Sequence, residues 1–188
     1  MAEEGKLLYV TDRQEWRRWL QENFEIEKEV WLVYPNKSSG EPRLPYNDAV
    51  EEALCFGWID STIHSVDEHH AAQRFTPRNP KSSYSQANKE RLCWLFQQGQ
   101  LHPSMENTAM NILAEEFIFP RDILEAIRND GAAWKNYGGF SDAYKRIRIA
   151  YIDSSRERPD EFKKRLDNFI RATRQNRKIG YGGIEKYY

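Results

Sequence analysis

The stretch GWIDSTIHS, residues 57–65, places a tryptophan and a carboxylate two residues apart. If this stretch is a β-strand, Trp58 and Asp60 share one face of it. A carboxylate beside an apolar ring has the features of a general base, because apolar surroundings disfavour its charged form. The alternative is a structural carboxylate that accepts backbone hydrogen bonds or pairs with an arginine such as Arg78. We favour the structural interpretation for an isolated acid.

A second candidate is the segment TPRNPKSSYSQANKER, residues 76–91, which combines cations, serines and the start of a helix. The free N–H groups and the dipole at a helix N-terminus attract anions, and Arg78 would add charge. The alternative is ordinary N-capping by Ser85, with Asn88 tying down the loop. The candidate ligand-binding residues are therefore Trp58, Asp60, Arg78, Ser85 and Asn88.

Metal ligation has little support in the sequence. The available residues are His64, Asp67, His69 and His70, and neighbouring histidines on a turn do not converge on one ion as an i, i+4 helical pair does. We interpret them as solvated turn residues, and we expect no metal and no cofactor.

Nucleophilic catalysis is also poorly supported. Cys55 is expected near the C-terminal end of a helix, where the dipole disfavours a thiolate, so we interpret it as a packing residue. Ser61 and His64 are three residues apart on the expected strand and point to opposite faces. The common glycine-rich nucleotide-binding loops are absent from the sequence.

Charge is distributed unevenly along the chain, although the net charge is only −1. Residues 1–70 carry 7 Lys/Arg and 15 Asp/Glu, whereas residues 141–178 carry 12 and 6. Arg171, Arg174 and Arg177 form a candidate basic surface that could contact the phosphates of nucleic acid or of an anionic lipid. Interleaved acids and the lack of a nucleic-acid-binding motif favour a solvated or internally paired face.

The elements that must position these residues follow from apolar periodicity and from capping residues. Thr11 or Asp12 can cap a first helix, with Glu15 available for a capping box. Apolar positions at helical spacing from Tyr46 to Leu54 predict another helix, and Gly57 can end it in the left-handed conformation. The expected strands are 28–35, 58–66 and 71–77, with a turn at 67–70.

The rest of the chain reads as helical. Helices are expected from Ser83 or Ser85 to Gly99, after Pro103, and over 121–129, 141–155 and 160–176. The tail 180–188 is expected to be loosely held. These elements predict an α+β fold with a small antiparallel or mixed sheet and packed helices, followed by a helical C-terminal module. The expected domains are 1–118 and 119–188.

Composition restricts the class of protein. Aromatic residues make up 13% of the 188 residues, which favours a packed core over disorder. No apolar run approaches the roughly 20 residues of a membrane span, and the N-terminus does not resemble a secretory signal. With only two cysteines, we expect reduced thiols in a soluble cytoplasmic protein.

Three blocks resemble one known family. EVWLVYPNK, YNDAVEEALCFGWIDS and RFTPRNPKSSYSQANKERL are similar to the bacteriocin-protection, YdeI/OmpD-associated (OmdA-like) family. FPRDILEAIRNDGAAW and FIRATRQNRKI resemble the start and the closing helix of its C-terminal region. Tyr84 stands where that family usually has tryptophan. The resemblance implies a bacterial protein linked to bacteriocin protection or envelope stress, and it brings no catalytic residue set.

We therefore expect a non-catalytic stress- or bacteriocin-protection-related protein that binds a small anionic ligand or a protein partner. The first alternative is a hydrolase-like enzyme with a site around Asp60, Arg78 and Asn88. The second is nucleic-acid binding through the basic C-terminal helices.

Overall fold

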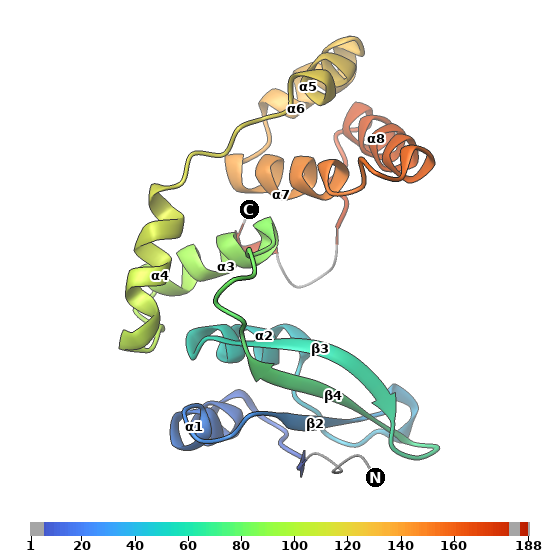
Figure 1. The fold of residues 1–188 in the computed structure, drawn as a ribbon. Coiled ribbons are helices and arrows are strands. Elements are labelled where there is room, and N and C mark those ends of the chain that lie inside the picture. Colours follow the sequence, from blue (N-terminus) through green and yellow to red (C-terminus); the bar gives the residue numbers. More distant parts are fainter. Residues whose placement is uncertain (1–5, 181–184, 188) are drawn as a thin grey trace. The chain divides into compact units, whose positions relative to one another are not determined.

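A computed structural model describes residues 6–180 and 185–187 (Figure 1). The chain forms two compact units. The first comprises Met1–Ser83 and Leu92–Asn111, and the second comprises Tyr84–Arg91 and Ile112–Tyr188. The predicted boundary between residues 118 and 119 stays a prediction.

A four-stranded mixed sheet in the order β1-β2-β4-β3 organises the first unit. The strands are β1 (Leu7–Leu8), β2 (Val30–Pro35), β3 (Trp58–Ser65) and β4 (His70–Pro77). β1 runs parallel to β2, while β4 is antiparallel to both β2 and β3. The predicted hairpin is therefore present, and β4 lies between β2 and β3 (Figure 1). The sequence did not predict β1, because two residues carry no detectable alternation.

Helix α1 (Arg13–Asn23) begins as its sequence predicts. The Asp12 side chain accepts hydrogen bonds from the backbone N–H groups of Gln14 and Glu15, and Glu15 in turn accepts from the N–H of Thr11. This reciprocal arrangement satisfies N–H groups that the helix itself leaves unpaired.

Helix α2 (Tyr46–Cys55) stops at Gly57, as its sequence predicts. Gly57 has a φ of +74°, and its N–H donates to the carbonyl oxygen of Leu54. Left-handed backbone at this point disfavours residues with a Cβ, so glycine lets the chain leave α2 and enter β3 directly.

The core of the first unit forms where α1 and α2 pack on the sheet. Trp16, Trp58 and Phe75 are at most 1% exposed, and the Trp16 and Phe75 rings meet edge to face with centroids 5.5 Å apart. The same unit buries the carboxylates of Glu51 and Glu52 on α2. Ion pairs with arginines of α1 compensate that burial, because a buried carboxylate needs a partner.

Two helices, α3 (Gln86–Gln97) and α4 (Pro103–Ala114), contribute residues to both units. The second unit is otherwise helical, with α5 (Arg121–Arg128), α6 (Gly131–Gly138), α7 (Asp142–Asp153) and α8 (Pro159–Arg174). Its core gathers aromatic and branched side chains, among them Ile123, Ile127, Tyr137, Tyr144 and Phe169. The α+β fold with a helical C-terminal part is thus confirmed.

Helix α6 is absent from the sequence-based expectation. Glycines at its ends and a length of eight residues hide its periodicity, but the Asp130 side chain caps it by accepting from the N–H of Ala133. The predicted tail falls largely on residues 181–184 and 188, which lie outside the described residues; residues 185–187 form a short 3-10 helix. Among the described residues, no helix is both long and apolar enough to cross a bilayer.

Candidate functional site

Asp60 has two donors that the sequence did not indicate. The hydroxyl of Tyr46 lies 2.8 Å from its Oδ2, and the side-chain amide of Gln73 donates to the same oxygen over 2.7 Å. Gln73 is 4% exposed, so its amide depends on this acceptor. The carboxylate therefore joins β3 to α2 and to β4, which is a structural arrangement.

Trp58 is a core residue. It is 1% exposed, its indole N–H donates to the carbonyl oxygen of Phe24 over 3.1 Å, and its ring meets Trp19 edge to face. With its polar atom satisfied and its ring covered, Trp58 has little surface to offer a ligand.

Arg78 holds its own loop. Its Nη2 donates to the carbonyl oxygens of Ser82, at 2.7 Å, and Ser83, while its backbone N–H donates to Gly57. These donors hold the polypeptide that follows β4.

Ser85 and Asn88 belong to the second unit, whereas Trp58, Asp60 and Arg78 belong to the first. Ser85 acts as the predicted cap, since its Oγ accepts from the N–H of Asn88 over 3.3 Å. The Asn88 side chain accepts from Nη1 of Arg91 over 2.8 Å. The five residues remain a predicted set.

A partly buried tyrosine near Asp60, Tyr34, was not predicted as a site residue. Burial raises the pKa of the Tyr34 phenol well above its ordinary value, with Tyr46 and Asp60 as further causes. Its hydroxyl is buried and has no hydrogen-bond partner among the described residues. Its position on β2 gave no signal, because tyrosine is common in strands.

The other candidate nucleophile and metal ligands have structural roles. Burial raises the pKa of the Cys55 thiol to about 12, so a thiolate is disfavoured at neutral pH. Asp67 accepts from the backbone N–H groups of His69 and His70 and also contacts the His70 ring, which builds the hairpin turn. Within the described residues, no group of three His, Cys, Asp or Glu side chains is placed to hold a metal ion.

The basic C-terminal residues divide into different environments. Arg174 is paired with Asp130, with its Nε 2.7 Å from the carboxylate, and Arg171 donates to the Asn168 side chain over 2.9 Å. Arg177 is exposed. Internal pairing of Arg174 leaves less free positive charge than the sequence suggests.

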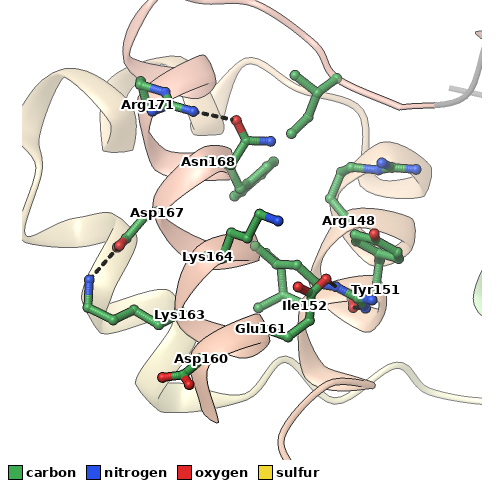
Figure 2. A pocket seen from close by; sticks show the side chains of 13 residues that line it. Arg148, Tyr151, Ile152, Asp160, Glu161, Lys163, Lys164, Asp167, Asn168 and Arg171 are labelled. Atoms are coloured by element: carbon green, nitrogen blue, oxygen red, sulfur yellow. Dashed lines mark hydrogen bonds and ion pairs between the residues drawn. The ribbon is translucent and has the colours of Figure 1, made fainter. Parts of the chain in front are cut away.

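A pocket of about 720 Å³ in the second unit combines free positive charge with apolar walls (Figure 2). It lies between α7 and α8, with Ile179 at one side. Ile152 and Phe169 form apolar lining and are each 1% exposed, and Tyr151 adds an exposed ring. The volume is within the range typical of small-molecule sites.

Four of the charged groups that line this pocket form two ion pairs within α8. Lys163 lies 2.6 Å from Asp167, and Arg165 lies 2.8 Å from Glu161. Arg165 also lowers the pKa of the Glu161 carboxyl through its hydrogen bond. These pairs form part of the pocket wall and add no net charge to it.

Two cations that line the pocket form no hydrogen bond or ion pair with any described residue: Arg148 of α7 and Lys164 of α8. Lys164 is exposed, and Figure 2 shows it reaching from α8 toward the helix that carries Arg148 and Tyr151. Both cations are therefore available to an anionic ligand.

Arg148 is the unusual member, because it is only 6% exposed. Its Nε is buried with no hydrogen-bond partner, and its guanidinium contacts the rings of Tyr144 and Tyr151 at 5.9 and 5.7 Å. A guanidinium stays charged at all accessible pH values, and burying it without an anion is costly. Contacts with aromatic rings recover part of that cost.

Arg148 was not predicted as a site residue, although its place in the sequence carries a signal. Tyr144, Arg148 and Ile152 are spaced four residues apart, so the arginine falls on the apolar stripe that α7 buries. A charged residue on such a stripe indicates either a buried ion pair or a ligand contact.

Comparison with known proteins gives two matches to family models. The model described as Domain of unknown function (DUF8412) matches residues 8–108, which is more than half of the chain. The chain belongs to this family. Residues 116–176 match a second model, described as Bacteriocin-protection, YdeI or OmpD-Associated. This match confirms the resemblance for the C-terminal blocks, whereas the three N-terminal blocks lie in the segment that matches DUF8412. Neither curated proteins nor solved structures give a match. The matched segment 116–176 contains Arg148, Lys164 and most of the pocket.

Proposed function

We propose that this protein is a non-catalytic binding protein for a small anionic ligand, and that the pocket between α7 and α8 is its binding site. The observation that carries the proposal is the unpaired guanidinium of Arg148, which is 6% exposed and lines a pocket of about 720 Å³. An anion in the pocket would supply the counter-charge that the described residues do not provide.

We place the anion site at Arg148 and not at the loop that contains Arg78. The Arg78 guanidinium donates hydrogen bonds to the carbonyl oxygens of Ser82 and Ser83. Arg148 and Lys164 form no hydrogen bonds to described residues. Because a bidentate guanidinium is well suited to carboxylate and phosphate, Arg148 is the better anchor.

The wider role that we propose is bacterial and related to bacteriocin protection or stress. The match of residues 116–176 supports it, since the pocket lies largely in that segment. We also propose a cytoplasmic location, because neither Cys55 nor Cys93 forms a disulfide, which suits a reducing compartment.

Thermal unfolding of the full chain tests the proposal. Phosphate, sulfate and acetate are compared with chloride at equal ionic strength, on the parent protein and on Arg148→Met. Excluded anions stabilise proteins generally, so the difference between the two proteins is the readout. At a ligand concentration 100 times the Kd, the parent Tm should rise by at least about 5 °C more than that of the variant.

Arg121→Met serves as the matched control, because Arg121 lies in the same unit, is 92% exposed and does not line the pocket. It should retain the full anion-dependent shift. If every anion stabilises the parent and Arg148→Met equally, the pocket is not an anion site and the proposal fails.

A further inference from the structure

Resting on this proposed function, we infer that the natural ligand is an organic carboxylate with a single negative charge and an apolar body. The pocket is larger than a bare inorganic anion needs, because its volume of about 720 Å³ is that of a site for a drug-sized molecule. An inorganic ion bound at Arg148 would leave most of this space to water.

The lining indicates an apolar body for the ligand. Ile152 and Phe169 close the pocket with apolar side chains, and Ile179 and Tyr151 offer partly exposed apolar surface. Burial of apolar ligand surface against such side chains is favourable and adds to the ion contact. A purely polar ligand would lack this favourable contribution to the binding free energy.

Charge in the pocket favours a ligand of low charge. Lys163 and Arg165 are neutralised by Asp167 and Glu161, so they do not contribute free positive charge. The carboxylate of Asp160, which is exposed and also lines the pocket, repels additional negative groups. Arg171 also lines the pocket and donates to the neutral Asn168 side chain, so two guanidinium groups and one ammonium group face the single carboxylate of Asp160. This small excess of positive charge suits a ligand of low charge better than a polyphosphate or a nucleic acid.

The guanidinium geometry favours a planar anion. Arg148 contacts the faces of Tyr144 and Tyr151, which restrict its orientation, and its terminal nitrogens form no hydrogen bond to a described residue. A carboxylate can accept two parallel hydrogen bonds from such a fork. Lys164 would then act as a second, mobile point charge at the exposed side of the pocket.

Isothermal titration calorimetry on the full chain tests this inference with 2-naphthoate, acetate, phosphate and the neutral analogue 2-naphthamide. We expect 2-naphthoate to bind at least about tenfold more tightly than acetate, because burying roughly 55 Å² of apolar surface already gives that factor. We expect 2-naphthamide to bind at least about tenfold more weakly than 2-naphthoate.

Two variants separate the contributions of charge and apolar surface. Arg148→Met should reduce the preference for 2-naphthoate over 2-naphthamide, leaving only the part that Lys164 provides. Ile179→Ala should weaken 2-naphthoate binding while leaving phosphate binding unchanged. If Arg148→Met does not fold, Lys164→Met on the exposed side provides the charge test, with a loss of about threefold to tenfold for each anion.

The outcomes are distinguishable. If phosphate binds through Arg148 as tightly as 2-naphthoate, the inferred ligand class is wrong and the anion-binding function stands. If no anion binds in an Arg148-dependent way, both are wrong.

Discussion

The hydroxyl of Tyr46, in the first turn of α2, lies 2.8 Å from the carboxylate Oδ2 of Asp60 on β3. Gln73 donates to the same oxygen from β4. Asp60 therefore links three elements of the first unit. We expect its replacement to lower the stability of the fold.

Replacement of Asp60 tests this structural role. Asp60→Ala leaves the buried Gln73 amide without an acceptor, so we expect the free energy of unfolding to fall by about 1–3 kcal/mol. Asp60→Asn keeps an acceptor oxygen, and we expect a loss of about 1 kcal/mol or less. Urea unfolding followed by circular dichroism measures both. Equal losses for the two variants would show that the hydrogen bonds do not matter. Loss of a measurable turnover in a stably folded Asp60→Asn protein would support the alternative of an enzyme.

The helix stop at Gly57 gives a second prediction. Its φ is +74°, and a Cβ built there would lie 3.0 Å from Sδ of Met105. Gly57→Ala should therefore lower the free energy of unfolding by about 1–2 kcal/mol, from backbone strain together with the close approach. Met105 is itself a core residue, so the comparison is made within the Met105→Ala background. There, Gly57→Ala should lose only the steric part of its cost, because the positive φ remains. A negligible cost of Gly57→Ala in that background would contradict the backbone strain.

The hairpin turn predicts a pH dependence that NMR can resolve. The hydrogen bond with Asp67 is the largest cause that raises the pKa of His70, and Glu41 adds to it. Hydrogen bonds from the His69 backbone and the His70 ring lower the pKa of Asp67. A raised histidine pKa gives stability that is lost as pH rises through the folded pKa. A lowered aspartate pKa gives stability that is lost as pH falls through its folded value. The turn is thus most stable at pH values between the folded-state pKa of Asp67 and that of His70.

Titration of the His70 ring carbons provides the measurement. Its pKa should lie above the ordinary histidine value in the parent protein and fall toward that value in Asp67→Asn. Glu41→Gln should cause a smaller fall, because Glu41 is the lesser contributor. An unchanged His70 pKa in Asp67→Asn would rule out the ring contact in solution.

These residues also show which parts of the fold can be predicted from sequence. The cap at Asp12, the stop at Gly57 and the hairpin were predictable, because each depends on residues close together in the chain. Helix α6 was not, since eight residues with terminal glycines carry little periodic signal. Its cap Asp130 also pairs with Arg174, 44 residues away, which no local pattern could indicate.

The candidate sites depend even more on distant partners. Asp60 was predicted to act with Arg78 and Asn88, but its donors are Tyr46 and Gln73, on elements that the fold brings beside β3. The spacing of Tyr144, Arg148 and Ile152 places Arg148 on the buried side of α7, but only the pocket between α7 and α8 shows that it can meet a ligand. Sequence identifies residue types, whereas burial and pairing decide which charge remains available.

The last prediction contrasts two arginines that both contact the Tyr151 ring. Arg165 donates to Glu161 and to the Tyr151 carbonyl oxygen, whereas Arg148 is buried without an anionic partner among the described residues. Arg165→Met should lower the free energy of unfolding by about 1–2 kcal/mol, because it removes satisfied hydrogen bonds. Arg148→Met should leave this free energy unchanged or raise it by about 1 kcal/mol, since an apolar side chain of similar volume removes the cost of an unpaired buried charge.

Urea unfolding with and without 2-naphthoate measures this contrast. The ligand should stabilise the parent protein and reverse the order, so that the parent becomes more stable than Arg148→Met at saturation. Such a reversal would mean that Arg148 is retained for binding at the expense of stability. If Arg148→Met lowers the stability of the ligand-free protein as much as Arg165→Met does, the guanidinium is a structural group held by its aromatic contacts, and the pocket loses its anchor.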